Sequence, residues 1–158
     1  MESKLKKDIS KIYLSIIVPF YNEVTSLPIL NKELIRTLTS IKGKCEIIYV
    51  DDASTDGSVD SLVKDIKNNG NKNIGIKLIS LRRNFGQTAA ISAGIDCVKG
   101  EMVAILDADL QNDPADLPVM IGKMEIGIDA VVGWRRNRYD GNLRVFLSKV
   151  ANWLIRII

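Results

Sequence analysis

Short apolar runs alternate with segments of helical periodicity along almost the whole chain, and this alternation constrains the fold more than any other feature. The apolar runs are rich in β-branched residues, as strands are, and cover 13–18, 46–50, 76–81, 102–106 and 130–133. Apolar residues at helical spacing predict helices over 26–41, 58–68, 87–99, 114–126 and 143–158. A helix between two strands makes those strands parallel. The sequence therefore predicts an α/β, Rossmann-like three-layer sandwich with a mostly parallel central sheet covered on both faces.

Local signals mark several of the predicted helix ends. Ser26 is suited to cap the helix at 26–41, and Gly100 to close the helix at 87–99. Asp113 and Pro114 have the residue types of an N-cap and first helical position, so they mark the start of the helix at 114–126.

The composition excludes several classes of function. The chain has 158 residues, 46% of them hydrophobic, which predicts one domain with a sizeable core. A net charge of +3 is too small to indicate a nucleic-acid partner. The chain has no histidine, which excludes Ser-His-Asp and Cys-His nucleophilic sites and the usual zinc sites.

Cysteine usage and hydropathy bear on location. Cys45 and Cys97 match no metal-binding spacing, and we interpret both as reduced, buried thiols of a cytoplasmic chain. No apolar run reaches the roughly 18 residues of a membrane-spanning helix, so no transmembrane segment is expected. Residues 1–12 are polar and rich in lysine, and we expect a flexible N-terminus rather than a site for an anionic surface.

Two carboxylates follow the apolar run at 102–106. Asp107 and Asp109 are two positions apart, so in an extended chain their side chains point to the same side, and Gln111 continues the spacing. Carboxylate and amide oxygens suit a hard divalent cation, Mg²⁺ or Mn²⁺, that also binds phosphates. This segment therefore predicts a metal site at the end of a strand.

The other predicted strands also end in polar groups. The segments are PFYNE at 19–23, DDASTDG at 51–57, RRNFG at 82–86, DADLQ at 107–111 and GWRR at 133–136. Ligands of open α/β sheets bind outside the carboxyl ends of the strands, so these groups are expected to meet on one rim. The rim lacks the glycine motifs of Rossmann dinucleotide sites and P-loops. A phospho-accepting receiver domain needs an acidic pair after its first strand, where this chain has Pro19 and Phe20. A metal with a phosphate-bearing ligand remains the best interpretation.

Four of these segments, in this order and spacing, resemble family 2 glycosyltransferases. They are Pro19 to Glu23, Val50 to Gly57, Arg83 to Gly86 and Asp107 to Gln111. The similarity covers residues 13–158 and is greatest to the polyprenyl-phosphate branch, which includes dolichol-phosphate mannose synthase. It implies a GT-A fold with a nucleotide-sugar-binding domain at 13–141.

The resemblance also implies roles for individual residues. Those implied to bind the nucleotide-sugar are Pro19, Tyr21, Glu23, Val50, Asp52, Asp107 and Ala108. Asp109 and Gln111 are implied to hold Mg²⁺ or Mn²⁺ on the diphosphate. Arg135 is implied to face a phosphate, with Arg83 as a second arginine on the same rim. For Tyr21 and Val50, plain packing is an equally good interpretation.

The implied reaction is inverting transfer of a sugar from a UDP- or GDP-linked donor to a polyprenyl phosphate, undecaprenyl or dolichyl, with Asp109 and Arg135 as catalytic residues. A lipid phosphate is already anionic and needs no strong general base, which suits a chain without histidine. Two alternatives stay open. One is transfer to a sugar hydroxyl in polysaccharide or glycolipid synthesis, and the other is a catalytically incomplete nucleotide-sugar-binding fragment or subunit.

The end of the chain differs from the family pattern. Family members continue further, so the resemblance implies a C-terminally truncated chain, a homo-oligomer or a missing C-terminal partner. Residues 142–158 predict an amphipathic helix, either interfacial or a core helix without its packing partner. With a lipid acceptor, the expected location is the cytoplasmic face of a membrane.

Overall fold

The computed structural model describes residues 11–71 and 73–133. The predicted amphipathic helix at 142–158, Arg135 and nearly all of the predicted flexible N-terminus lie outside these residues. The strands, the first three helices and the site described below belong to one compact unit that ends at Gly122.

Four parallel strands form the sheet, in the spatial order β3-β2-β1-β4. In chain order the elements are β1 (Ile12–Phe20), α1 (Leu27–Thr39), β2 (Lys44–Asp51), α2 (Ser58–Asn69), β3 (Ile74–Ser80), α3 (Gln87–Ile95), β4 (Met102–Ile105), the 3₁₀ turn η1 (Pro114–Asp116) and α4 (Leu117–Glu125). The predicted alternation and parallel pairing are confirmed for these four strands.

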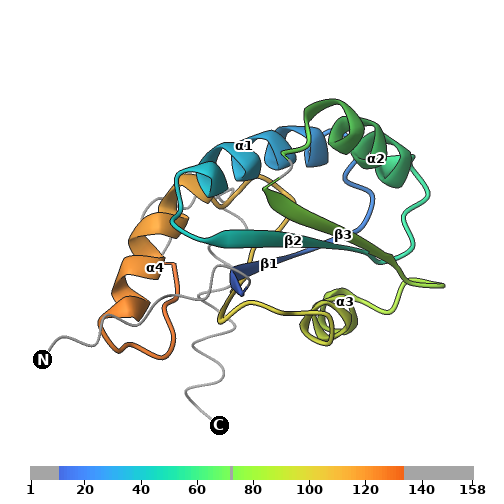
Figure 1. Ribbon diagram of the computed structural model, residues 1–158. Helices are drawn as coiled ribbons and strands as arrows, with labels where there is room; N and C mark the ends of the chain where they lie inside the picture. The colour runs from blue at the N-terminus through green and yellow to red at the C-terminus, as the bar shows by residue number, and fades with distance from the viewer. Residues whose placement is uncertain (1–10, 72, 134–158) are drawn as a thin grey trace, which may run out of the picture. The chain divides into compact units, whose positions relative to one another are not determined.

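Each face of the sheet has its own core, because neighbouring residues of a strand point to opposite faces. On one face, Ile16 and Tyr49 belong to a cluster that includes the buried leucines of α1. On the other, Ile17 and Ile48 cluster with Ala90 of α3. Figure 1 shows α1 and α2 above the sheet and α3 below it. The prediction of a sheet covered on both faces is therefore confirmed.

The helix α3 lies unusually close to the sheet. A Cβ atom placed on Gly94 would be 2.5 Å from Cγ2 of Ile17, closer than non-bonded carbon atoms approach. Ala90, one turn earlier, is fully buried. The small residues of α3 thus let its backbone pack directly on β1 and β2.

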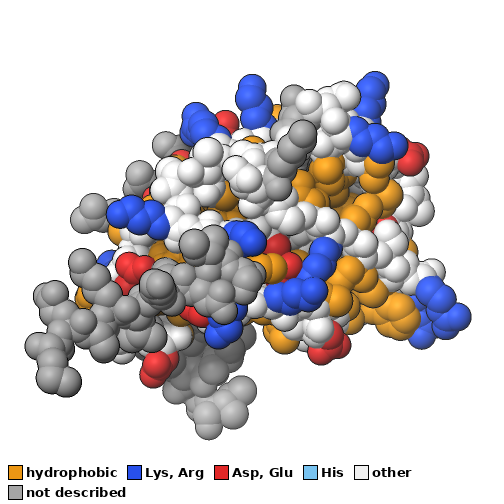
Figure 2. All heavy atoms as spheres, in the orientation of Figure 1, with side chains coloured by type: hydrophobic (Ala, Val, Ile, Leu, Met, Phe, Trp, Pro, Cys, Tyr) orange, Lys and Arg blue, Asp and Glu red, His pale blue; other side chains and the backbone are white. Residues whose placement is uncertain are grey.

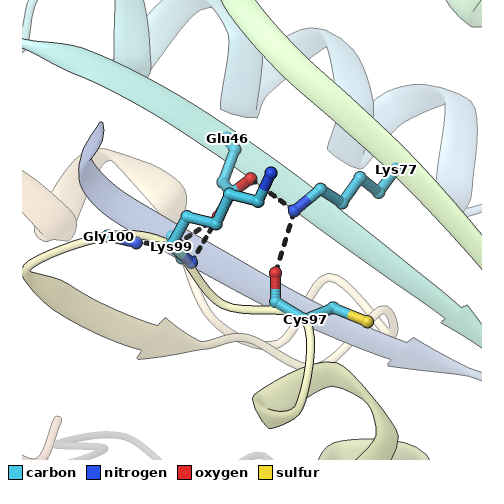
Figure 3. A network of polar contacts seen from close by, with 6 residues as sticks. Glu46, Lys77, Cys97, Lys99 and Gly100 are labelled. Carbon is cyan, nitrogen blue, oxygen red and sulfur yellow. Dashed lines mark hydrogen bonds and ion pairs between the residues drawn. The ribbon is translucent and has the colours of Figure 1, made fainter. Parts of the chain in front are cut away.

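A buried polar network holds the connection between α3 and β4 (Figure 3). Oε2 of Glu46 lies 2.9 Å from Nζ of Lys77, which also donates to the carbonyl oxygen of Cys97 at 2.8 Å. Oε1 of Glu46 accepts from the Ser15 hydroxyl and from the backbone N–H of Lys99. Side chains from three strands thus hold the segment between α3 and β4.

Three predictions of local structure need correction. Residues 130–133 form no strand, since no neighbouring strand among the described residues pairs with them, and Val132 is 89% exposed. The helix predicted at 87–99 ends at Ile95, because the polar network draws residues 97–100 towards the sheet. Cys97 is only partly buried, whereas Cys45 is buried as predicted, and both thiols are free.

The helix ends agree with the sequence in one case and differ in two. Asp113 caps η1 by accepting a hydrogen bond from the backbone N–H of Ala115 at 2.8 Å. Ser26 stands at the N-cap of α1 but makes no capping hydrogen bond, because its hydroxyl bonds to Glu23. Gly100 does not close α3 and instead donates its N–H to Oγ of Ser15 at 2.8 Å.

The surface carries charged and apolar side chains together. Figure 2 shows Lys and Arg side chains spread over one face, with apolar side chains exposed between them. Among the described residues, no helix combines the length and apolar character needed to cross a bilayer.

Candidate functional site

A pocket of about 270 Å³ opens at the carboxyl ends of β1, β2 and β4, beside the first turns of α3. Its lining residues are Pro19, Phe20, Tyr21, Glu23, Asp52, Gln87, Ala90, Asp107, Ala108 and Asp109. The pocket therefore lies at the edge of the sheet where the polar strand ends were expected to meet.

Most of the predicted nucleotide-binding residues meet in this pocket, and three of the predicted site residues that the structure describes do not line it. Val50 is fully buried in the core next to Ala90. Arg83 is exposed, with its guanidinium carbon 4.7 Å from the centre of the Phe85 ring. Gln111 adjoins the pocket through Asp109, and Arg135 lies outside the described residues.

Two loops of the pocket are joined by hydrogen bonds between side chains and backbone. Oγ of Ser54 accepts from the backbone N–H of Asn22 at 2.9 Å, and Oδ1 of Asn22 accepts from the N–H of Thr55 at 2.8 Å. The N–H of Glu23 donates to Oγ of Ser58 at 2.8 Å. These bonds hold the segment with Tyr21 and Glu23 against the loop after β2, so both pocket residues have a fixed backbone.

Asp52 is a buried carboxylate that organises the entrance to α3. It is 4% exposed, and its oxygens accept hydrogen bonds of 2.8 Å from the backbone N–H groups of Phe85 and Gly86. Gly86 has a φ of 90°, which glycine adopts without the strain that a side chain would add. Asp52 thus lines the pocket and also fixes the loop that leads into α3.

Asp107 and Asp109 reach the pocket by a different route from the one expected. The strand β4 ends at Ile105, so alternation along an extended strand does not align the two carboxylates. A turn at residues 108–110, with Leu110 at a φ of 60°, bends the chain instead. Both carboxylates still line the pocket, and Oδ1 of Asp109 accepts from the N–H of Gln111 at 3.0 Å.

Strained backbone conformations occur in the loops after three strands that border the pocket. Asn22, Ala53 and Leu110 have φ values of 57°, 64° and 60°, which residues with side chains seldom adopt. Each follows a strand that borders the pocket. Such outliers concentrate at functional sites, where the surrounding structure stabilises them.

The donor atoms of the pocket fit a hard divalent cation that also binds a phosphate ligand. Asp107 and Asp109 supply carboxylate oxygens, and Gln111, whose backbone N–H is bonded to Asp109, carries a side-chain amide oxygen. No cluster of three or more His, Cys, Asp or Glu side chains suited to a metal occurs in the described ranges. Mg²⁺ typically binds to one or two carboxylates, with substrate phosphates and water completing its coordination. The pair is sufficient for that type of site.

Sequence reasoning missed three lining residues, namely Phe20, Gln87 and Ala90. Phe20 stands within the PFYNE segment, and Gln87 directly follows the RRNFG segment. Gln87 could have been identified in the sequence as the polar first residue of a predicted helix that follows the end of a strand. Ala90 carries no chemical signal in the sequence.

Comparisons with known proteins agree with this geometry. Residues 15–157 match the family model described as "Glycosyl transferase family 2". The chain is 41% identical to a dodecaprenyl-phosphate galacturonate synthase of Rhizobium johnstonii, over 92% of this chain and 41% of that protein. It is 39% identical to an undecaprenyl-phosphate 4-deoxy-4-formamido-L-arabinose transferase of Salmonella choleraesuis, over 90% of this chain and 43% of that protein. It therefore spans about two fifths of the length of these relatives.

A solved structure agrees with the fold. A mannosyltransferase of Pyrobaculum calidifontis, in complex with GDP-Man and Mn²⁺, superposes with a TM-score of 0.53 at 24% identity, over 67% of this chain and 30% of that one. The predicted GT-A fold class is confirmed. With a match over nearly the whole chain, this protein belongs to glycosyl transferase family 2.

Proposed function

We propose that the pocket binds the nucleotide-sugar donor of an inverting glycosyltransferase whose acceptor is a polyprenyl phosphate. The observation that carries this proposal is the 41% identity, over 92% of the chain, to a dodecaprenyl-phosphate galacturonate synthase. The pocket supports it, because acidic, aromatic and backbone groups from three strand ends converge there.

The lining residues are proposed to divide between the two halves of a nucleoside diphosphate. Pro19, Phe20 and the 46% exposed Tyr21 offer apolar and aromatic surface for a flat base. Glu23 and Asp52 offer carboxylate oxygens for donors on the nucleoside. Asp107 and Asp109 stand apart in sequence from these groups and are the acidic residues proposed to face the diphosphate.

The diphosphate is negatively charged, so two carboxylates beside it need a cation. Asp109 and Gln111 are proposed to hold Mg²⁺ or Mn²⁺, with Asp107 contacting the nucleotide. When bound, such a cation offsets the charge that develops on the leaving nucleoside diphosphate.

In the proposed reaction, the chain's own residues bind and orient the two substrates and need not remove a proton. An oxygen of the acceptor phosphate forms a bond to the anomeric carbon, and the bond from that carbon to the diphosphate breaks, which inverts the configuration in one displacement. The acceptor phosphate is anionic and needs no base. Arg135, and Arg83 on the exposed rim, are proposed to offset repulsion between the acceptor and donor phosphates. A lipid acceptor places this reaction at a membrane surface.

Because the chain spans about two fifths of its relatives' length, nucleotide binding and sugar transfer are separate predictions. A nucleotide-sugar-binding module without transfer activity of its own is the second candidate. The experiment is transfer of radiolabelled sugar from UDP- and GDP-linked donors to a short-chain polyprenyl phosphate in detergent, with Mg²⁺ or Mn²⁺. Label in the organic phase is expected, and it should be lost in Asp109→Asn and retained in Asp60→Asn, an exposed carboxylate on α2.

Two other outcomes separate the alternatives. Label that reaches only a sugar hydroxyl acceptor contradicts the lipid-phosphate proposal. Nucleotide binding without any transfer by the folded chain supports the binding-module candidate instead.

A further inference from the structure

Gln87 is a polar pocket residue that none of the sequence motifs includes. Its Nε2 atom donates a hydrogen bond of 2.7 Å to Oδ1 of Asp107, which lies 20 residues further along the chain. The bond joins the first residue of α3 to the segment after β4, and both residues line the pocket. Gln87 therefore connects two elements that border the same ligand space.

The backbone at Gln87 is fixed from two directions. Before it, the N–H of Gly86 is bonded to buried Asp52, and the carbonyl of Gly86 accepts from Ala90 at 3.2 Å. After it, Gly94 leaves no space between α3 and Ile17 of the sheet. These contacts anchor α3 at both points, so the backbone that carries the Gln87 side chain is held in place.

Asp107 has much less support of its own. It lies two residues beyond the end of β4, and its side chain is partly exposed. Within residues 11–71 and 73–133, Gln87 is the only side chain bonded to its carboxylate, and Oδ2 has no hydrogen bond there. A hydrogen bond to an ionised acceptor is strong and directional, so Gln87 restricts the orientation of the Asp107 carboxylate and leaves one of its oxygens for a ligand.

We propose that Gln87 is a positioning residue for nucleoside diphosphate binding. By holding Oδ1 of Asp107, it keeps Oδ2 turned towards the ligand before the ligand arrives. The cost of ordering the carboxylate is then met during folding and not during binding. This inference rests on the proposed function, and it assigns Gln87 an action through Asp107 and not on the ligand itself.

Three variants of the full chain test this role. Gln87→Leu keeps the bulk of the side chain and removes its hydrogen-bond donor. Gln87→His restores a neutral N–H donor at pH 8 without the amide oxygen. Thr88→Ala, at the next and exposed position of α3, is the matched control.

The first readout is the dissociation constant of UDP and of GDP with Mn²⁺, measured by calorimetry at pH 8. We expect Gln87→Leu to weaken binding by about tenfold or more, Gln87→His to restore it to within about threefold of wild type, and Thr88→Ala to leave it unchanged. The thermal unfolding midpoint of each variant checks that the fold is retained. Binding by Gln87→Leu within about twofold of wild type overturns the inference.

A loss in Gln87→His equal to that in Gln87→Leu also overturns it, because it indicates direct contact between the glutamine amide and the nucleotide. Absence of binding to wild type would contradict the proposed function. Equal binding by wild type and Gln87→Leu would instead contradict only the role of Gln87.

A second readout does not need the nucleotide. In an NMR spectrum of ¹⁵N-labelled protein, the Gln87 side-chain amide is assigned by its absence in Gln87→Leu. The hydrogen bond predicts that Asp107→Ala shifts this signal and that Thr88→Ala does not. An unchanged signal in Asp107→Ala contradicts the bond on which the inference depends.

Discussion

Oε2 of Glu46 lies 2.9 Å from Nζ of Lys77, although the Glu46 side chain is only 2% exposed. A carboxylate buried to this extent is costly unless it is fully hydrogen-bonded, and the Ser15 hydroxyl and the Lys99 N–H supply the further bonds. Lys77 also binds the carbonyl of Cys97. The pair therefore stabilises the fold chiefly by fixing the chain between α3 and β4.

Removing the cation of this pair should leave an uncompensated buried charge. We expect Lys77→Met to lower the free energy of unfolding by about 2–3 kcal/mol at pH 7, somewhat less than for a fully buried pair because Lys77 is a third exposed. Lys64→Met, an exposed lysine on α2, should change it by less than about 0.5 kcal/mol. Urea unfolding measures both. Equal stability of the two variants would show that the ion pair contributes nothing.

The same pair predicts a dependence of stability on pH. Burial alone raises the pKa of Glu46, but the bonds from Ser15, Lys77 and Lys99 and the charge of Lys77 outweigh burial and lower the pKa below its usual value. The unfolded state therefore binds more protons in the acid range, and stability falls as pH decreases through the folded-state pKa. This contribution is fully present above about pH 5.

Glu46→Gln isolates this contribution, because the variant has no proton to bind at that position. We expect the difference in unfolding free energy between wild type and Glu46→Gln to shrink as pH is lowered from 6 to 3. A difference that stays constant over this range contradicts the lowered pKa.

The close contact between α3 and the sheet predicts opposite effects at two helical glycines. Gly94→Ala places a methyl group 2.5 Å from Cγ2 of fully buried Ile17, so we expect it to destabilise the fold by about 1–3 kcal/mol. Gly122 in α4 has open space at its Cβ position, and Gly122→Ala should stabilise by about 0.5–1 kcal/mol. Thermal unfolding of both variants measures the signs. A stabilising Gly94→Ala would contradict the packing described here.

Asp52 should matter for both stability and binding. Asp52→Ala leaves the N–H groups of Phe85 and Gly86 without their acceptor, and we expect a loss of about 2 kcal/mol together with weaker nucleotide binding. Asp52→Asn keeps one acceptor oxygen and should lose less. Asp60→Ala serves as the control for loss of an acidic side chain. If Asp52→Ala were as stable as wild type but bound the nucleotide more weakly, Asp52 would contribute to ligand binding and not to the stability of the fold.

The alternation of strands and helices and the parallel pairing could be predicted because they follow from residue patterns along the chain. The first strand extends past its predicted end through Pro19, which the sequence did not indicate. Pairing of β1 with β4 ends at Ile17 and Ile105, so the missing N–H of Pro19 leaves no partner in β4 unsatisfied. Whether a strand can include a proline thus depends on where the neighbouring strand ends, and the local sequence pattern does not contain that information.

The end of α3 also depends on contacts from other elements. Small residues at 87–99 favour a helix locally, but Lys77 and Glu46 bind the backbone of Cys97 and Lys99 and redirect the chain. A signal for this network was present. Ser15, Glu46 and Lys77 are each polar residues in apolar strand runs, and Ser15 and Glu46 are paired across β1 and β2.

For the site, the sequence identified side chains with distinctive chemistry and missed residues placed by the fold. Asp52, Asp107 and Asp109 follow apolar runs and were predicted, and all three line the pocket. The role proposed for Gln87 depends on the contact between the start of α3 and Asp107, which follows β4. Long-range contacts of this kind need the structure.

Calorimetric titration of the full chain with UDP and with GDP, with and without Mn²⁺, shows whether this pocket binds a nucleotide through a metal. We expect that at least one nucleotide binds, that binding requires the cation, and that Asp109→Ala abolishes binding while Asp60→Asn retains it. Absence of binding to the folded wild-type chain, or unchanged binding in Asp109→Ala, would contradict the assignment of this pocket as a metal-dependent nucleotide-sugar site.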